Sequence, residues 1–335
     1  MSRRRVCVTG GTGYIGSWLV KKLLDRGCTV HATTRNLGDE GKTGLLRSLP
    51  GAAERLRLFE ADIYDAATFE PAVAGCEFVF LVATPMMQNG IGSSKDATEV
   101  MIEATRTILR QCEQAKTVRR VIHTGSVMAA SPFKHDGTGF RDLVDESCWS
   151  PLIPSCDYRT EGLDGYVSSK TLSEKELLGY NAGDDRAFEV VTLVCGLVGG
   201  DTLLPYVPDS VQVVVSPLTG AEPWLGGLRF MQAFLGAVPL LHVDDACEAH
   251  AFCMDPPSLA GRFLCAAAHP NLRDIVGHYR RRHPELNPPI KEVVGEGVRV
   301  EAGTSKLQDL GFKYRFGVEE VLDGSVECSK RLGLL

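Results

Sequence analysis

Short runs of apolar and β-branched residues alternate with longer amphipathic stretches in the first half of the chain. Strand-like runs occupy residues 6–8, 29–33, 56–59, 78–83, 120–123 and 188–193. Between them, stretches such as 18–24 and 100–109 repeat apolar residues at helical spacing. Strands and helices that alternate in this way predict right-handed βαβ units, and therefore a doubly wound parallel sheet of the α/β class.

A glycine-rich segment follows the first predicted strand. It runs from Thr9 to Gly16 and opens a helix that is expected to begin near Ser17. In a Rossmann-type unit the first glycine allows a sharp turn, the second lets a pyrophosphate approach the backbone, and the third lets the helix pack closely on the sheet. The helix N-terminus adds N–H groups and a positive dipole end. The alternative is that the glycines serve only a tight turn. We predict a dinucleotide site that includes Gly10, Thr12, Gly13, Tyr14 and Ile15.

The end of the second strand discriminates between the two nicotinamide cofactors. Arg35 follows that strand and Lys42 comes shortly after it, whereas Asp39 and Glu40 come too late to bind the ribose hydroxyls. A guanidinium can meet a 2′-phosphate through two hydrogen bonds and stack on adenine. NADPH is therefore the expected cofactor.

The ends of the next two strands are expected to complete the cofactor site. Asp62 and Ile63 follow the third strand and are placed to meet the adenine. Val82, Ala83 and Thr84 end the fourth strand on the ribose side. Asp62 has an alternative role as a cap for the turn that follows it.

Tyr166 and Lys170 stand four residues apart in a helical stretch that continues to Leu178. That spacing puts both side chains on one face of the helix. A tyrosine hydroxyl is a weak acid at neutral pH, and a neighbouring ammonium stabilises its ionised form. The pair therefore suits proton transfer, and Lys170 can also hold the ribose hydroxyls of the nicotinamide.

Ser126 ends the strand that begins at Arg120, at the edge where open α/β sheets bind their ligands. Its hydroxyl can hold a carbonyl oxygen while Tyr166 protonates that oxygen and NADPH delivers hydride to the carbon. The alternative is that Ser126 only caps a turn.

The regular alternation weakens after about Gly196. Residues 200–235 contain several prolines, residues 205–235 show no regular pattern, and one more strand is expected near 239–250. We therefore expect an NADP-binding domain of residues 1–195 plus the strand near 239–250. A smaller C-terminal substrate lobe is expected from residues 196–238 and 251–335.

Composition argues against several other classes of protein. The 335 residues carry 36 basic and 42 acidic side chains, and the net charge of −6 argues against a nucleic-acid partner. No apolar run approaches the roughly 20 residues of a membrane span, and no apolar signal region follows the basic start, so we expect a cytoplasmic enzyme. The 11 cysteines include no Cys-x-x-Cys pair, which favours reduced thiols and leaves open a bridge between Cys148 and Cys156. The eight histidines do not cluster, and no metal is expected. The oligomeric state is left open.

With these motifs the chain resembles the extended short-chain dehydrogenases/reductases. The similar branch contains the plant dihydroflavonol 4-reductases, flavanone 4-reductases, anthocyanidin reductases, cinnamoyl-CoA reductases and HC-toxin reductase. The resemblance covers essentially the whole chain and includes residues 9–19, 145–150, 169–175 and 242–245. It implies an NADPH-dependent reductase in which Ser126, Tyr166 and Lys170 are the catalytic triad. It also implies further cofactor contacts at Thr124, Cys195, Leu197 and Ser210.

Several residues depart from the pattern of this branch. Thr107 stands where the family often has Asn, and Cys195 stands where it usually has Pro. Ser131 occupies the position at which dihydroflavonol reductases grip the flavonoid hydroxyls with Asn or Asp, so a 3-hydroxylated substrate is less well supported. The cinnamoyl-CoA reductase signature Asn-Trp-Tyr is missing around Tyr166, which disfavours a thioester substrate.

The resemblance makes reduction of a flavonoid C4 ketone the leading hypothesis, with a flavanone preferred over a dihydroflavonol. The substrate is then a small molecule that contacts Ser126, Ser131, Tyr166 and Met86. Alternatives in the same class are the reduction of another carbonyl, as in HC-toxin reductase, and double-bond reduction, as in anthocyanidin reductase. A nucleotide sensor without catalysis is disfavoured because Tyr166 and Lys170 are both intact, and an epimerase is disfavoured by Arg35.

Overall fold

The computed structural model describes residues 4–83, 94–134, 136, 138–153, 155–183, 185–290 and 298–335. The chain divides into two compact units. Unit 1 comprises Met1–Gly125, Leu172–Leu193 and Cys247–Phe263, and unit 2 comprises Ser126–Thr171, Val194–Ala246 and Leu264–Leu335. The predicted domain boundaries divide the chain by function, into cofactor and substrate parts, and they stay a prediction.

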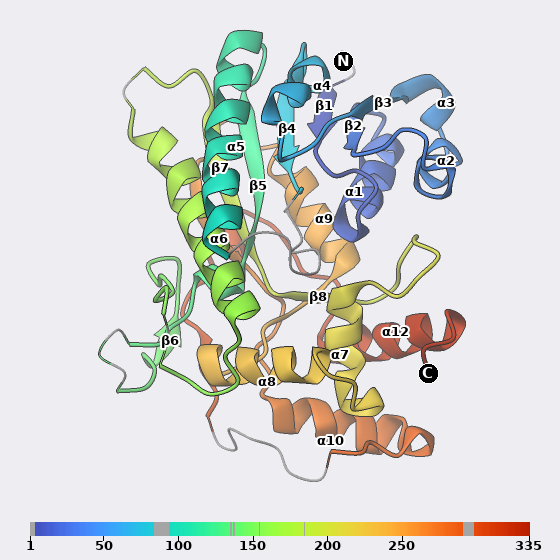
Figure 1. The fold of residues 1–335 in the computed structure, drawn as a ribbon, viewed down its shortest axis with the longest axis vertical. Helices are drawn as coiled ribbons and strands as arrows, with labels where there is room; N and C mark the ends of the chain where they lie inside the picture. Colours follow the sequence, from blue (N-terminus) through green and yellow to red (C-terminus); the bar gives the residue numbers. More distant parts are fainter. Residues whose placement is uncertain are drawn as a thin grey trace. The chain divides into compact units, whose positions relative to one another are not determined.

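A seven-stranded sheet is the centre of the fold (Figure 1). Its strand order is β10-β7-β5-β4-β1-β2-β3, and the pairs β1–β2, β1–β4, β2–β3 and β4–β5 are parallel. The chain reverses its direction of progress along the sheet between β1 and β4, which is the switch point at which such sheets bind ligands. The strands are β1 (Arg5–Val8), β2 (Thr29–Thr34), β3 (Leu56–Glu60), β4 (Phe78–Leu81), β5 (Arg120–Ser126), β7 (Glu189–Cys195) and β10 (Gly261–Cys265).

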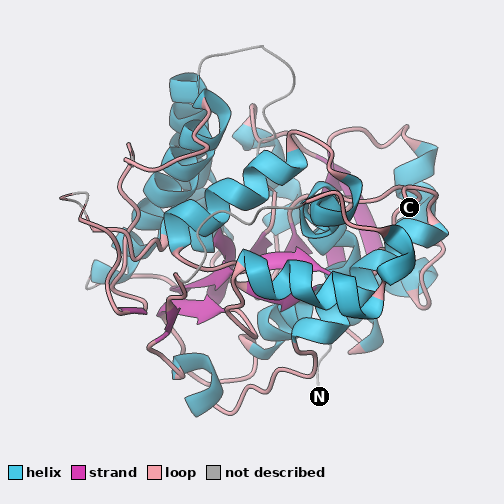
Figure 2. Cartoon of the chain, turned by 90° about the horizontal axis from the view of Figure 1, so that it is seen from below, coloured by secondary structure: helices cyan, strands magenta, loops and turns pink. Residues whose placement is uncertain are grey.

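All six predicted strands of the first half are confirmed, and so is the doubly wound α/β class. The helices among these strands are α1 (Tyr14–Asp25), α2 (Glu40–Arg47), α3 (Ala52–Arg55), α4 (Glu70–Val73), α5 (Ser94–Ala115) and α6 (Glu161–Gly179), and α9 (Val243–Phe252) comes later in the chain. Helix α1 begins at Tyr14, three residues before the predicted start, because Gly13 already takes the cap position. Figure 2 marks the helices, strands and loops along the chain.

Alternation along the strands builds the core of unit 1, because successive side chains point to opposite faces of a sheet. Cys7, Val79, Val121 and Val190 share one face, where they pack with residues of α4, α5 and the C-terminal part of α6. On α1, the apolar residues between Leu19 and Leu24 are buried.

Unit 2 is mainly helical and carries two short sheets. Its helices are α7 (Asp209–Thr219), α8 (Trp224–Leu235), α10 (Leu272–Arg282), α11 (Lys306–Asp309) and α12 (Val318–Arg331). Strand β8 (Leu197–Gly199) pairs with β9 (Leu240–His242), and β6 (Leu143–Val144) pairs with β11 (Glu301–Ala302). Short 3₁₀ turns complete the chain: η1 (Ala66–Phe69), η2 (Val127–Ala129), η3 (Tyr180–Ala182) and η4 (Pro284–Leu286).

The second half differs from expectation in two places. The expected strand is present as β9, but it is short and pairs with β8 outside the main sheet, and residues 243–252 form the helix α9. The segment 205–235, for which no pattern was expected, forms α7 and α8. Both helices end at glycines with positive φ, Gly220 at 65° and Gly236 at 68°, which is the usual way to terminate a helix.

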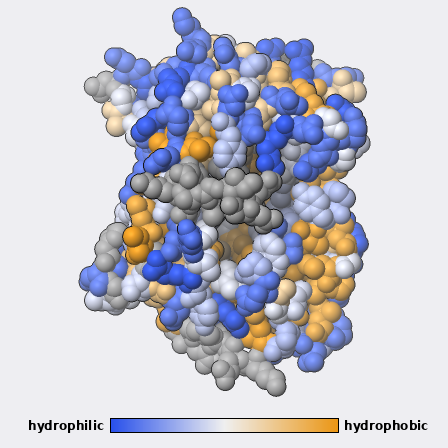
Figure 3. Space-filling view, viewed as in Figure 1, coloured by the Kyte–Doolittle hydropathy of each residue, from blue (hydrophilic) through white to orange (hydrophobic). Residues whose placement is uncertain are grey.

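On the face shown in Figure 3, hydrophilic side chains cover much of the surface and apolar side chains form smaller patches between them. No helix within the described residues combines the length and the apolar character needed to cross a membrane.

Candidate active site

The glycine-rich turn of unit 1 has the backbone geometry of an anion site. Gly10 has a φ of 65°, a conformation that favours glycine. The N–H of Gly13 donates to the carbonyl of Gly10 at 3.0 Å and closes the turn. Gly13 then caps α1 without a side-chain hydrogen bond. A helix N-terminus of this kind presents backbone N–H groups and a positive dipole end to a phosphate.

A Cβ added to these glycines shows which side of the turn is filled by protein. At Gly16 the added atom would lie 2.1 Å from the carbonyl oxygen of Gly10, and at Gly11 it would lie 2.8 Å from Cβ of Ala32. At Gly13 the nearest atom would be the carbonyl oxygen of Gly10 at 3.3 Å, with no second neighbour within 4 Å. Gly16 and Gly11 therefore allow close packing, whereas Gly13 keeps one side of the turn open. This arrangement fits a bound pyrophosphate.

The ends of β2 and β4 are hydrogen-bonded to this turn. Thr12 and Thr34 join their hydroxyls at 3.3 Å, and Thr9 Oγ1 accepts from the N–H groups of Val82 at 2.9 Å and of Ala83 at 3.0 Å. A Cβ on Gly10 would meet Ala83 at 3.1 Å. The structure thus brings Val82 and Ala83 to the turn, as a dinucleotide site requires. Thr84 lies outside the described residues.

Arg35 differs from Lys42 in its electrostatic surroundings. Arg35 is exposed directly after β2, and no ion pair of its guanidinium occurs within the described part of the chain. Lys42 lies in α2, where its ammonium is 3.4 Å from the carboxylate of Asp39. The backbone N–H of Lys42 donates to the same carboxylate at 3.2 Å. Because Asp39 already neutralises Lys42, Arg35 is the better candidate for a 2′-phosphate.

Asp62 follows β3, and its carboxylate accepts from the N–H of Tyr64 at 3.1 Å. This local turn is the alternative that the sequence left open, and it is compatible with a contact through the second carboxylate oxygen. Ile63 beside it is half-buried. Thr124, near the end of β5, is 2.8 Å from Nε2 of the buried His250.

Helix α6 presents the predicted reactive pair of unit 2. The ammonium of Lys170 lies 6.0 Å from the ring centre of Tyr166, so the two side chains share one face of the helix. Lys170 is 5% exposed, whereas Tyr166 is 36% exposed. A largely buried ammonium beside an accessible phenol suits proton transfer to a bound molecule.

Ser126 is the last residue of β5 and caps η2. Its Oγ accepts from the N–H of Met128 at 3.2 Å, so the capping alternative is realised. Capping uses a lone pair of the oxygen, and the O–H group can still donate to a carbonyl. The two roles considered for Ser126 are therefore compatible.

The remaining predicted contacts lie in unit 2. Ser131 is 2% exposed, and its hydroxyl donates to the carbonyl of Phe234 at 2.5 Å and accepts from the N–H of Phe133 at 3.0 Å. This hydroxyl serves the fold, and its contact with substrate stays a prediction. Three predicted cofactor contacts follow in the chain: Cys195 and Leu197 are buried and Ser210 is half-buried at the start of α7. Met86 lies outside the described residues.

All 11 cysteines are free thiols, including Cys148 and Cys156. These two cysteines therefore form no disulfide bond with each other in this structure. Cys195 hydrogen-bonds to Cys265, and that bond together with burial raises the pKa of the Cys265 thiol. The Cys265 thiol is thus kept in its neutral form.

No sequence motif marks Glu174, which lies one helical turn after Lys170. Glu174 is fully buried, binds Arg262 through two contacts of 2.9 and 3.1 Å, and accepts from the hydroxyl of Thr192 at 2.7 Å. The ion pair joins α6 to the neighbouring strands β7 and β10. The available signal was an acidic residue four positions from Lys170, on the buried side of the helix.

Comparison with known proteins places this geometry in a family. The model of the NAD dependent epimerase/dehydratase family matches residues 6–264. The chain is 33% identical over 346 residues to an anthocyanidin reductase ((2S)-flavan-3-ol-forming) of Vitis vinifera, with 100% of the chain and 98% of that protein covered. It is 32% identical over 334 residues to a bifunctional dihydroflavonol 4-reductase/flavanone 4-reductase of Malus domestica, with 98% and 91% covered.

Among solved structures, vestitone reductase from alfalfa (Medicago sativa L.) is similar with a TM-score of 0.78 and 30% identity, over 99% of both chains. The family match and these relatives confirm the resemblance drawn from the sequence motifs, and with it the expected nicotinamide dinucleotide. The protein therefore belongs to the NAD dependent epimerase/dehydratase family of extended short-chain dehydrogenases/reductases, and it is an oxidoreductase related to plant flavonoid reductases.

Proposed function

We propose that the protein is an NADPH-dependent carbonyl reductase of plant specialised metabolism that reduces the C4 ketone of a flavanone, or of a dihydroflavonol, to the 4-hydroxy product. The observation that carries the proposal is the placement of Tyr166 and Lys170 on one face of α6, with 6.0 Å between the ammonium and the ring centre.

The roles of the residues follow from the charge that develops on the substrate. When bound, NADPH supplies the hydride that adds to the carbonyl carbon. The O–H of Ser126 donates to the carbonyl oxygen and orients it. Tyr166 transfers its proton to that oxygen as negative charge develops there, and Lys170 stabilises the resulting phenolate. With the hydride on carbon and the Tyr166 proton on oxygen the ketone becomes an alcohol, and solvent then returns a proton to Tyr166.

The choice of NADPH rests on Arg35. Its guanidinium follows β2 directly, and Thr34 beside it is joined to Thr12 of the glycine-rich turn. The bound dinucleotide would place its adenosine ribose at this strand end. Charge-assisted hydrogen bonds from Arg35 then favour a 2′-phosphate over a hydroxyl.

The choice of a C4 ketone is supported by the Malus domestica relative, whose name gives reduction at the 4-position of both dihydroflavonols and flavanones. Ser131 supports the flavanone as the preferred substrate. Its hydroxyl is committed to Phe234 and Phe133, and it has no carboxylate or amide with which to grip a 3-hydroxyl.

The test is NADPH oxidation by the purified full-length protein with naringenin, eriodictyol, dihydroquercetin, cyanidin and coniferaldehyde, each analysed for product. Naringenin and eriodictyol should give the 4-hydroxy products at the highest kcat/KM. Failure of every flavonoid would refute the substrate class and favour an HC-toxin reductase-like activity.

Tyr166→Phe tests the proton donor in the same assay. The substitution removes only the hydroxyl, so kcat should fall by about 10²- to 10⁴-fold while NADPH affinity stays within about threefold. Tyr180→Phe is a matched control, because Tyr180 uses its hydroxyl to bind Glu113 at 2.9 Å. A Tyr166→Phe variant that retains more than a tenth of the activity would remove Tyr166 from the acid role.

A second candidate function is anthocyanidin reduction. The similarity to the Vitis vinifera anthocyanidin reductase, at 33% identity over the whole chain, favours it. Formation of a flavan-3-ol from cyanidin, with no product from naringenin, would decide for this second function.

A further inference from the structure

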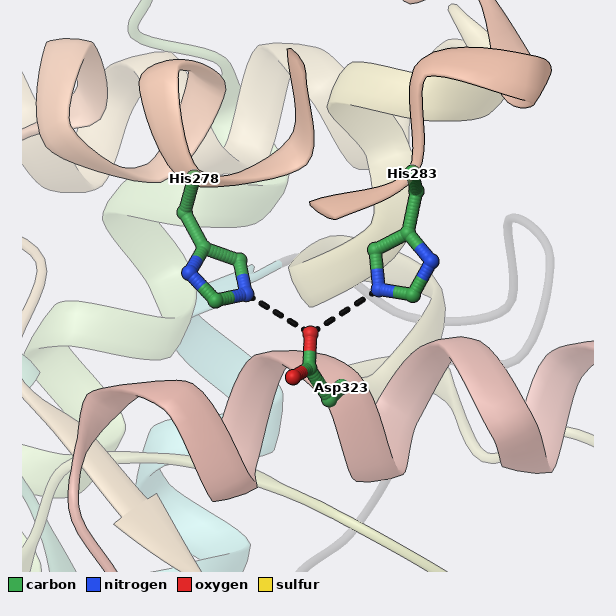
Figure 4. Close-up of side chains that lie close together, drawn as sticks. All are labelled: His278, His283 and Asp323. Atoms are coloured by element: carbon green, nitrogen blue, oxygen red, sulfur yellow. Dashed lines mark hydrogen bonds and ion pairs between the residues drawn. The ribbon is translucent and has the colours of Figure 1, made fainter. Parts of the chain in front are cut away.

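Two histidines and one aspartate of unit 2 converge at the contact between α10 and α12 (Figure 4). His278 lies on α10, His283 directly follows that helix, and Asp323 lies on α12. Nε2 of His278 is 2.7 Å and Nε2 of His283 is 2.9 Å from the same oxygen, Oδ1 of Asp323. Both histidines are buried, at 3% and 8% exposure. The sequence separates Asp323 from the histidines by 40 residues or more, so the expectation that the histidines take part in no cluster is wrong.

The surroundings of this cluster bear on where the protons lie. Nδ1 of His283 faces the carboxylate of Glu285 at 3.7 Å, and Glu285 is also bound by Lys330 at 3.1 Å. A neutral imidazole carries one N–H. If Nε2 of His283 used that N–H toward Asp323, its Nδ1 lone pair would face a carboxylate oxygen, and the two would repel. If the Nε2 lone pair instead bound a cation, Nδ1–H would point to Glu285. Histidines that bind metals usually donate their second N–H to a carboxylate, and Glu285 at 3.7 Å needs only a small side-chain adjustment to accept it.

We propose that His278, His283 and Asp323 form a site for one divalent transition-metal ion of the Zn²⁺ type, which ties α12 to α10. Two imidazole nitrogens and one carboxylate oxygen match the ligands that Zn²⁺ takes, with water in the fourth position. Mg²⁺ and Ca²⁺ would instead require a shell of oxygen atoms. Zinc bonds of about 2.0–2.1 Å put the ligand atoms of a tetrahedral site about 3.3 Å apart. The contacts of 2.7 and 2.9 Å to Oδ1 therefore need to lengthen by about half an ångström, and the ligand atoms already lie within 4.8 Å of one another.

The remaining neighbours are compatible with a bound cation. Oδ2 of Asp323 accepts from Arg282 at 3.4 Å, which orients the carboxylate and leaves Oδ1 for the metal. Helix α12 also packs against α7, β8 and β9. Metal binding would therefore fix the last helix to the rest of unit 2. The proposal is independent of the proposed reaction.

The experiment uses the full-length protein without a histidine tag, stripped of metal with a chelator and desalted. Co²⁺ is titrated with visible spectroscopy and Zn²⁺ with calorimetry. One equivalent should bind, with the d–d bands of a four-coordinate nitrogen and oxygen site. A thiolate-to-cobalt band should be absent, because ten of the 11 cysteines are buried and only Cys156 is partly exposed. The metal should also raise the thermal unfolding midpoint.

The decisive variant is His283→Gln. Glutamine can still donate a hydrogen bond to Asp323 from its amide, but it is a poor ligand for Zn²⁺. The variant should weaken Zn²⁺ binding by at least about 100-fold and should lose the metal-dependent rise in the midpoint. Glu285→Gln alters only an exposed neighbour of the site, so it should fold normally and weaken binding by about 10-fold or more. His269→Gln removes a histidine elsewhere in unit 2 and should bind as the unaltered protein does.

An ion-pair network without metal predicts other results. In that case His283 carries two N–H groups, one for Asp323 and one for Glu285. The proposal is overturned if no single equivalent binds, or if His283→Gln and Glu285→Gln bind Zn²⁺ as tightly as the unaltered protein.

Discussion

The buried ion pair between Glu174 and Arg262 should be a principal determinant of the stability of unit 1. Nε of Arg262 lies 2.9 Å from Oε1 of Glu174 and Nη2 lies 3.1 Å from Oε2, so the guanidinium binds the carboxylate through two hydrogen bonds. Glu174 is 0% and Arg262 is 5% exposed at the side chain. The pair fixes α6 one turn beyond Lys170.

Arg262→Met removes the cation and leaves the carboxylate of Glu174 with the hydroxyl of Thr192 as its remaining partner in this network. An uncompensated buried charge costs about 3–5 kcal/mol. The double variant Arg262→Met/Glu174→Leu removes both charges, and such replacements are neutral or stabilising in other proteins. The double variant should therefore recover most of the loss.

The control is a more exposed ion pair, which joins α6 to α5. Arg106 binds Glu176 of α6 through two hydrogen bonds as well, at 2.8 and 3.1 Å, but the two side chains are 49% and 32% exposed. Arg106→Met should lower the free energy of unfolding far less than Arg262→Met does, because water screens the charges and solvates the carboxylate left behind. The two pairs share their geometry, so burial is the variable.

The assay is urea unfolding followed by far-ultraviolet circular dichroism, with the free energy of unfolding compared among the four proteins. The reasoning predicts a large loss for Arg262→Met, a small loss for Arg106→Met and recovery in the double variant. A loss below about 1 kcal/mol for Arg262→Met, or a double variant no more stable than the single one, would refute it.

The cofactor site and the half-buried His269 give three further tests. Arg35→Gln should raise the KM for NADPH by about 10- to 100-fold, which corresponds to the loss of a charge-assisted hydrogen bond of about 1.5–3 kcal/mol. The KM for NADH should change little, and equal changes for both cofactors would contradict the role of Arg35. Gly16→Ala would force a Cβ to 2.1 Å from the Gly10 carbonyl oxygen and should abolish NADPH binding in calorimetry, whereas Gly44→Ala, with nothing within 4 Å, should leave it intact. Burial lowers the pKa of His269 from 6.5 to about 4, so protonation favours the unfolded state and stability should fall as the pH drops from 6.5 toward 4. His269→Gln should flatten the urea midpoint over that pH range, and an unchanged profile would contradict this role of His269.

The first half of the fold could be predicted because its signals are local. Each strand is a short β-branched run, and the glycine-rich turn carries its conformational requirement in the residues themselves, with Gly10 at positive φ. The Tyr166–Lys170 pair was predictable for the same reason, because helical spacing alone puts the two side chains on one face.

The helices α7 and α8 were not predicted because their composition opposes their structure. The run around Val211 to Val215 is rich in β-branched residues, which favour strands, and Pro217 lies inside α7. Burial of Val211, Val214 and Val215 on one side of the helix overrides that preference. The glycines after each helix, Gly220 and Gly236, were the available signals for the helix ends.

The sequence could not predict contacts between residues that lie far apart along the chain. Glu174 meets Arg262 and His278 meets Asp323 only after the chain has folded, and no spacing rule relates such positions. The role of Ser131 is similar. The family resemblance suggests a substrate contact for Ser131, which stays a prediction, but it gives no sign that the hydroxyl also donates to the carbonyl of Phe234.

The most direct test of the proposed reaction is to follow the hydride itself. NADPH carrying deuterium at C4 of the nicotinamide, prepared in each of its two stereochemical forms, is incubated with the protein and naringenin, and the product is analysed by mass spectrometry and NMR. The account predicts that one of the two forms yields a 4-hydroxy product with a single deuterium on C4. Absence of product with both forms, or deuterium at another carbon of the flavonoid, would contradict it.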